Sequence, residues 1–169
     1  MSQLLLLRHA KAVKAKPAMS DFERPLANEG LAALDLLAEA MKKSNLFPQR
    51  VVLSGSCRTR ETAFGLIERL GVEIETIIDD GIYHGGPGDY MKAIMQHGDV
   101  ERLMLVAHNP TIEELALSLC GHGNTDSIAR LISGFPTAAL ATISFEKPLP
   151  EIARKQGFLE SFPIPQIIS

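Results

Sequence analysis

Short apolar runs along this chain alternate with longer segments of helical periodicity. Residues 4–7 (LLLL) and 103–107 (LMLVA) are continuous apolar runs, a pattern typical of strands that are buried on both faces. Residues 50–54 (RVVLS) and 138–145 (AALATISF) predict two further strands. Residues 72–78 (VEIETII) alternate apolar and acidic side chains, which predicts a strand with one exposed face.

Helical spacing marks segments between these strands. Asn28 is expected to cap the first helix, and Gly71 is expected to end the second. Asn109 and Pro110 are expected to open the last helix. The tail from residue 146 is rich in proline and gives no assignment. The apolar positions predict helices within residues 28–41, 59–70, 89–96 and 110–119.

Strands that alternate with helices predict an α/β domain. We expect a three-layer sandwich with a mostly parallel central sheet and helices on both faces. The 169 residues, of which 46% are hydrophobic, fit a single domain over residues 1–169 whose core needs neither disulfides nor a structural metal. In such sheets, ligands bind at the carboxyl ends of the strands.

The overall charge and the start of the chain exclude several classes of partner. A net charge of −3 and a pI near 5.9 give no general attraction to nucleic acid or to an anionic membrane. The apolar run that ends at Arg8 is too short for a transmembrane helix or a secretory signal. With only two cysteines, Cys57 and Cys120, far apart in the sequence, the chain is expected to be cytoplasmic.

Polar side chains follow three of the predicted strands. Arg8 and His9 come directly after the first strand, Arg58 lies shortly after the second, and His108 follows the run 103–107. Because the carboxyl ends of parallel strands meet at one edge of a sheet, we expect these side chains to converge. Two arginines and two histidines at one point would form an anion site.

These residue types suit phosphoryl transfer without a metal or a cofactor. A neutral imidazole is a nucleophile near pH 7 once a hydrogen bond to its other nitrogen fixes the tautomer, and His9 is the candidate. The planar guanidinium group of arginine donates paired hydrogen bonds to phosphate oxygens and stays charged. We therefore expect Arg8, Arg58 and His108 to hold the phosphoryl oxygens while His9 attacks phosphorus, after which water attacks the phosphoenzyme.

Several blocks of sequence, in order along the chain, carry these residues. LLLLRHAKA contains Arg8 and His9, LSGSCRTRETA fits the pattern S-x-x-x-R-(A/T)-x-x-T-A at Arg58, and LMLVAHNPTIEELA fits V-(G/A)-H-N at His108. These blocks resemble the histidine phosphatase superfamily, also called phosphoglycerate mutase-like. The stretches DFERPLANEG, DGIYHG and FPTAALATISF are similar to its short bacterial branch of phosphohistidine phosphatases, the SixA type.

The resemblance implies a metal-independent phosphatase that acts on histidine-phosphorylated signalling or phosphotransfer proteins. Where the family usually has Ser-Pro, this chain has Ser54-Gly55, and in place of the glutamate general acid of larger members it offers Asp79 and Asp80. Asp80 is the candidate proton donor. The absence of long insertions predicts an open site, which favours a phosphoryl group on a protein surface.

Two other functions stay open. One is a phosphatase of small phosphate esters such as sugar phosphates. The other is a phosphate-recognising binding module with little activity. The sequence makes no prediction of the oligomeric state.

The remaining polar residues have alternative interpretations. Asn109 either caps the following helix, which the adjacent Pro110 favours, or contacts phosphate. Asp21 and Arg24 either position the loop over the site or pair with each other, and Thr137 is a further candidate. The pair Cys120 and His122 is too small a set of ligands for a zinc site. We interpret the following as residues without a site role: Arg60, Cys57, His84, His97 and His122.

Overall fold

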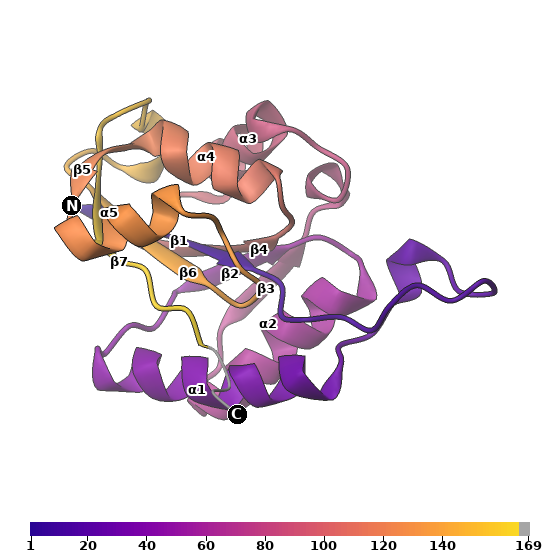
Figure 1. Cartoon of the computed structure of the whole chain (residues 1–169). Helices are drawn as coiled ribbons and strands as arrows, with labels where there is room; N and C mark the ends of the chain where they lie inside the picture. The colour runs from indigo at the N-terminus through magenta and orange to yellow at the C-terminus, as the bar shows by residue number, and fades with distance from the viewer. Residues whose placement is uncertain (166–169) are drawn as a thin grey trace.

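The strands of this protein join in one sheet. The computed structural model describes residues 1–165. The strands are β1 (Ser2–Arg8), β2 (Arg50–Leu53), β3 (Glu75–Ile78), β4 (Arg102–Ala107), β5 (Cys120–Gly123), β6 (Leu140–Phe145) and β7 (Gly157–Ser161). Their order is β3-β2-β4-β1-β6-β7-β5, and β6 runs antiparallel to its two neighbours, whereas the other pairings are parallel (Figure 1).

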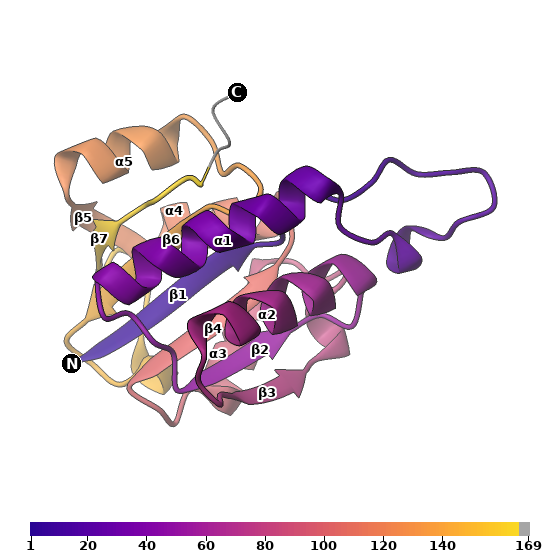
Figure 2. The same cartoon turned by 90° about the horizontal axis from the view of Figure 1, so that it is seen from below.

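Helices cover both faces of this sheet. They are α1 (Asn28–Lys43), α2 (Cys57–Leu70), α3 (Pro87–His97), α4 (Thr111–Leu119) and α5 (Thr125–Ile132). Helices α1 and α2 lie side by side on one face, while α3 and α4 lie on the other (Figures 1 and 2). The predicted three-layer α/β sandwich with a mostly parallel sheet is therefore confirmed. Over residues 1–165, none of the helices has the length and apolar character that crossing a membrane requires.

The continuous apolar runs are explained by the two cores of the sandwich. In β1, Leu4 and Leu6 pack into the core shared with α3 and α4, whereas Leu5 and Leu7 pack into the core shared with α1 and α2. All four leucines have no exposed surface. Successive side chains of a strand point to opposite faces, so a central strand between two helical layers must be apolar at every position.

Two predicted helix caps are wrong. Helix α1 begins at Asn28, so its cap is Ala27, whose N–H donates to the carbonyl of Lys11 at 2.8 Å. This bond to a distant segment holds Ala27 in an extended conformation. The helix therefore begins at Asn28 itself, one residue earlier than it would if Asn28 were the cap. Helix α4 follows Pro110 as its cap, and the side chain of Asn109 donates to Glu113 instead of accepting from a helix N–H.

Other boundaries also differ from the prediction. Helix α2 begins at Cys57, two residues before the predicted start, so Arg58 lies in its first turn rather than in a loop. Gly71 ends that helix in the left-handed conformation, as predicted. The sequence did not predict β5, α5 and β7, which fill the region after α4 and part of the proline-rich tail. Residues 166–169 of that tail lie outside the described residues.

The register of the central strands decides where the functional side chains meet. In the β1–β4 pair, Arg8 lies opposite Ala107, and in the β2–β4 pair, Leu53 lies opposite Val106. The residues that follow these positions are His9, His108 and Ser54. Three strand ends therefore deliver their next side chains to the same edge of the sheet.

The segment between β1 and α1 forms an arm beside this edge, which we call the arm (residues 11–27). Its base is closed by an antiparallel bridge between Ala12 and Leu26 and by the bond from Val13 N–H to the carbonyl of Pro25 at 2.9 Å. Beyond this base the arm projects outward from the body of the protein (Figure 1). A short 3-10 helix, Asp21–Glu23, forms its returning side.

The arm is anchored to α1 by a close approach that requires glycine. A Cβ atom on Gly30 would lie 2.3 Å from the carbonyl oxygen of Lys11. We predict that Gly30→Ala lowers the free energy of unfolding by about 1–3 kcal/mol, because a rigid backbone atom must move, and urea denaturation measures this change. Gly88→Ala in α3 is the matched control, since a Cβ there has no neighbour within 4 Å. Equal stability of the two variants would contradict this prediction.

Candidate active site

His9 lies at the carboxyl end of β1 and is only 8% exposed. Its backbone N–H donates to the carbonyl of Ala107 at 3.1 Å, which extends the β1–β4 ladder by one bond. Its Nδ1 lies 2.8 Å from the carbonyl oxygen of Ala10. A carbonyl only accepts, so Nδ1 carries the proton and Nε2 keeps its lone pair. The hydrogen bond that a nucleophilic imidazole requires is therefore present.

Both predicted arginines are held by backbone carbonyls. Arg8 donates from Nη1 to the carbonyl of Phe135 at 2.8 Å. Arg58, which is 6% exposed, donates from Nη1 to the carbonyl of Asp21 at 2.8 Å and from Nη2 to the Asp21 carboxylate at 3.0 Å. These contacts use the outer nitrogens of each guanidinium group. The Nε atom of each remains for another partner.

His108 lies beside His9, with the two ring centroids 5.3 Å apart. Its backbone N–H donates to the hydroxyl of Tyr90 at 3.2 Å, and its Nε2 lies 2.7 Å from Oγ of Ser54. The residue is 7% exposed. The structure thus brings together all four residues that the sequence predicted for the phosphoryl site.

Several buried polar atoms of this site have no hydrogen-bond partner among residues 1–165. They are Nε of Arg8, Nε of Arg58, Nδ1 of His108 and Oδ1 of Asn109, and the other such side-chain atom in the described part of the chain is Oγ1 of Thr142 in β6. Buried polar groups are nearly always hydrogen-bonded, so a group of unsatisfied atoms in one place indicates a ligand. Three of the four are nitrogens that can donate, which suits an anion.

The residues that carry these four atoms line a surface pocket with an excess of positive charge. Its lining residues are Arg8, His9, Lys11, Ala12, Asp21, Arg24, Arg58, Tyr83, His84, His108, Asn109 and Thr137. Asp21 is the one acid among these lining residues. A larger hollow at the opposite end of the sheet, next to Met1, His122 and Phe158, lacks such a cluster of arginines and histidines.

Burial and neighbouring charge keep both histidines neutral. Desolvation, with the charges of Arg58 and Arg8, lowers the pKa of His9 to about 4. Desolvation and the proximity of His9 and Arg58 lower the pKa of His108 to about 3. At neutral pH, His9 is therefore a competent nucleophile without a separate base.

Asp21 contacts more residues of the site than the sequence predicted. It accepts a hydrogen bond from Tyr83 Oη at 2.6 Å and pairs with both Arg58 and Arg24 at 3.0 Å. The bond from Tyr83 and the pairing with Arg58 lower the pKa of Asp21 to about 2. Both sequence interpretations hold, since Asp21 pairs with Arg24 and also ties the arm to Arg58.

The structure does not bring Asp80, the predicted proton donor, to this pocket. Asp80 is exposed and is not among the residues that line the pocket. Its carboxylate lies next to Gly55, because a Cβ atom on that glycine would be 3.2 Å from Oδ1 of Asp80. The neighbouring Asp79 accepts from the N–H of Gly81, and its Oδ2 lies 3.6 Å from Nε2 of His97. Asn109, the second option for phosphate contact, does line the pocket.

The other candidates divide between the pocket and the surface. Thr137 lines the pocket, and so does His84, so the interpretation that gave His84 no place in the site is wrong. Tyr83 and Ser54 also escaped prediction, although both lie within the quoted blocks of sequence. Arg60 is exposed on α2, as predicted, and Cys57 lies half-buried in the first turn of α2 against Glu61. Residues 1–165 contain no group of three or more His, Cys, Asp or Glu side chains placed to hold a metal ion.

The depressed pKa values predict the titration of the free protein. In an NMR titration of the histidine ring protons, we expect His9 and His108 to stay neutral from pH 8 to about 5, with midpoints near 4 and 3. The folded-state pKa values lie below 6.5, so protons enter these rings only after the pH has fallen through the usual histidine range. A midpoint near 6.5 for His9 would refute this account of its environment.

Known proteins are similar to this chain in sequence and in fold. No protein-family model matches the chain. An uncharacterised protein of Mycobacterium leprae is 27% identical over 165 residues, which cover 95% of this chain and 100% of that protein. A crystal structure from Agrobacterium tumefaciens, to which the activity of the phosphohistidine phosphatase SixA is ascribed, is 30% identical with a TM-score of 0.83.

The match to the Agrobacterium structure covers 97% of this chain and 98% of that protein. A mycobacterial glucosyl-3-phosphoglycerate phosphatase shares the fold with a TM-score of 0.64 at 16% identity, over 95% of this chain and 99% of that protein. The chain is therefore a phosphatase of the histidine phosphatase superfamily, and it belongs to the SixA-type, phosphoglycerate mutase-like branch.

Proposed function

We propose that this protein removes the phosphoryl group from phosphohistidine on signalling or phosphotransfer proteins, through a phosphohistidine intermediate on its own His9. The observation that carries the proposal is the set of unsatisfied nitrogens on residues that line one pocket together with His9. Nε of Arg8, Nε of Arg58 and Nδ1 of His108 lack partners within the described residues. Three donors match the equatorial oxygens over which a phosphoryl group spreads its charge.

The first chemical step follows from this geometry. Nε2 of His9 attacks phosphorus, a P–N bond to His9 forms, and the bond between phosphorus and the substrate imidazole breaks. The substrate nitrogen keeps the electron pair of the broken bond. Arg8, Arg58 and His108 stabilise the charge on the oxygens throughout. An imidazole leaves more readily than an alkoxide, so this substrate depends little on a strong general acid.

The second step regenerates the enzyme. Water attacks phosphorus, the P–N bond to His9 breaks, and inorganic phosphate is released with the protons of the water on its oxygens. The lone pair returns to Nε2, while the bond from Nδ1 to the carbonyl of Ala10 keeps the ring in the same tautomer. The peptide N–H of Ala10 donates to Oγ1 of Thr62 at 3.0 Å, which ties the strand end to α2 and limits the movement of the nucleophile.

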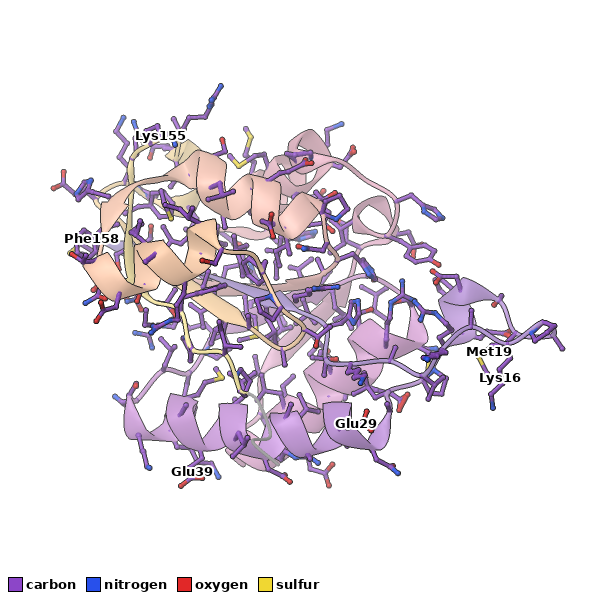
Figure 3. All side chains as sticks on the ribbon, in the orientation of Figure 1. Lys16, Met19, Glu29, Glu39, Lys155 and Phe158 are labelled. Atoms are coloured by element: carbon purple, nitrogen blue, oxygen red, sulfur yellow. The ribbon has the colours of Figure 1, made fainter. Side chains whose placement is uncertain are left out.

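The shape and charge around the pocket favour a protein as substrate. The arm projects beside the pocket, and its outer part carries the exposed residues Lys14 and Lys16, which form no ion pair within residues 1–165 (Figure 3 labels Lys16 and Met19 there). A small ester bound between Arg8 and Arg58 gains nothing from charges this far out. An acidic protein surface around a phosphohistidine would gain electrostatic attraction.

The comparisons favour the same substrate. The Agrobacterium protein, to which phosphohistidine phosphatase activity is ascribed, is the 30% identical match, whereas the mycobacterial sugar-phosphate phosphatase shares the fold at 16% identity. Hydrolysis of a small phosphate ester is the alternative, and phosphate recognition without turnover is the second alternative. With phosphotransfer proteins as substrates, we also propose a cytoplasmic location.

The first test compares phosphate release by wild type with release by variants of His9 and Arg58. We expect wild type to release phosphate rapidly from a histidine-phosphorylated protein, and we expect His9→Ala to release none. Arg58→Ala should lower kcat by about 10²–10³-fold, the usual cost of losing one oxyanion donor. Phosphate release under an alkaline quench measures both, because phosphohistidine is labile in acid.

Arg60→Ala is the matched control, because Arg60 is exposed on the same helix and should keep wild-type rates. Equal activity of wild type and His9→Ala would overturn the mechanism. Activity of wild type on an aryl phosphate but not on the phosphoprotein would move the substrate to small esters. Phosphate binding without any turnover would establish the binding module.

The second test addresses the arm. We expect the double variant Lys14→Glu, Lys16→Glu to lower kcat/KM for the phosphoprotein by about 10-fold at low salt, because rim charges act mainly on association. The effect should shrink as salt is added, since screening weakens exposed charges. Hydrolysis of an aryl phosphate should not change, because neither lysine lines the pocket.

The control carries the same change of charge far from the site. Lys42→Glu, Lys147→Glu places it at the end of α1 and after β6, where both residues are exposed. An equal loss of phosphoprotein activity in this control would show that net charge, not the arm, is responsible. An equal loss on the aryl phosphate in the arm variant would show damage to the pocket.

A further inference from the structure

We propose that Ser54 is a positioning residue for His108, fixing the ring so that its Nδ1–H donates to the phosphoryl group. The proposal rests on the proposed phosphoryl transfer and assigns a role to a residue that does not line the pocket. Ser54 acts through His108 and does not contact the substrate.

The position of Ser54 follows from the sheet. It comes directly after β2, whose last residue Leu53 lies opposite Val106 of β4. Ser54 therefore lies beside the end of β4, with Oγ 2.7 Å from Nε2 of His108. Ser54 has no exposed surface, so water does not compete for this bond.

The Ser54 hydroxyl belongs to a buried cluster with Ser56 and Thr59. Oγ of Ser54 lies 2.8 Å from Oγ1 of Thr59, which lies 2.9 Å from Oγ of Ser56. Oγ1 of Thr59 also lies 2.7 Å from the carbonyl of Ser54, so the start of α2 is tied to the end of β2. All three residues have no exposed surface. The cluster holds Ser54 in one place behind the imidazole.

The bond to Ser54 decides which nitrogen of His108 is left to bind a ligand. The backbone of His108 is held by Tyr90, and Nε2 is occupied by Ser54, which leaves Nδ1 as the nitrogen without a partner in residues 1–165. A neutral imidazole has one N–H, and phosphoryl oxygens only accept. When an anion is bound, the proton must therefore lie on Nδ1, and the Ser54 hydroxyl must donate to Nε2.

A hydroxyl suits this role better than a carboxylate. A carboxylate behind Nε2 would hold the proton there and add a negative charge to a phosphate site. A hydroxyl donates to a neutral ring and accepts from a protonated one, so it supports His108 in either state. Without the hydroxyl, the tautomer with the proton on Nδ1 leaves Nε2 as a buried acceptor with no partner. In the other tautomer the proton lies on Nε2, and Nδ1 can no longer donate to the phosphoryl group.

NMR tests the proposal without relying on turnover. Long-range ¹H–¹⁵N spectra of the protein with vanadate distinguish which ring nitrogen of His108 is protonated. We expect the Nδ1–H tautomer in wild type, and in Ser54→Ala a mixture or the Nε2–H tautomer. We expect kcat on an aryl phosphate to fall about 10- to 100-fold in this variant, with a smaller change in KM.

Two further variants separate this role from a loss of stability. Ser54→Thr keeps the hydroxyl and should restore the Nδ1–H tautomer. Thr142→Val removes another buried hydroxyl, on β6 and away from the site, and should keep the wild-type tautomer and rate. The Nδ1–H tautomer together with wild-type kcat in Ser54→Ala would overturn the proposal, as would an equal loss in Thr142→Val.

The same measurements distinguish this proposal from the proposed function. If wild type hydrolyses no phosphorylated substrate but the tautomer changes in Ser54→Ala with vanadate, the phosphatase function fails and the positioning role stands. If wild type is active and Ser54→Ala changes neither tautomer nor rate, the positioning role fails and the function stands.

Discussion

The parallel hydrogen bonding of β1, β4 and β2 is the constraint on which the rest of this structure depends. Because Arg8 lies opposite Ala107 and Leu53 opposite Val106, the next residues along each strand reach the same edge of the sheet. A shift of one residue in either pair would turn the following side chain to the other face. The two apolar cores on either side of these strands fix the register, since Leu5 and Leu7 fit one core and Leu4 and Leu6 the other.

The chemistry of the site depends on an imbalance of charge in a protein that is acidic overall. Three guanidinium groups, the ammonium group of Lys11 and the neutral imidazoles of His9 and His108 line the pocket with one carboxylate, that of Asp21. This carboxylate is already engaged by Arg58, Arg24 and Tyr83. The backbone carbonyls of Phe135 and Asp21 hold the outer nitrogens of the arginines. An anion therefore meets donors that are oriented before it arrives, which is the condition for stabilising charge in a transition state.

Much of this could be predicted from local sequence, and the exceptions have a common cause. The buried strands, the two covered faces of the sheet and the meeting of Arg8, His9, Arg58 and His108 follow from apolar runs and from what comes after them. Strand β5, with the sequence CGHG, has no such pattern and exists because it pairs with β7. The cap of α1, the contact of Asp21 with Arg58 and the place of Asp80 outside the pocket depend on residues far away in the chain, and periodicity does not contain that information.

The closed base of the arm separates two parts of the protein that would otherwise change together. The bridge between Ala12 and Leu26 keeps the ends of the arm together whatever lies beyond them, and the contact with Gly30 holds that base against α1. Substitutions at residues 14–19 are then transmitted weakly to His9, three residues before the bridge, whereas Asp21 on the returning side holds Arg58 and belongs to the site. Substitutions in this outer segment can therefore change which partner proteins are recognised while the reaction centre stays the same. Relatives that catalyse one reaction can in this way diverge in their protein substrates.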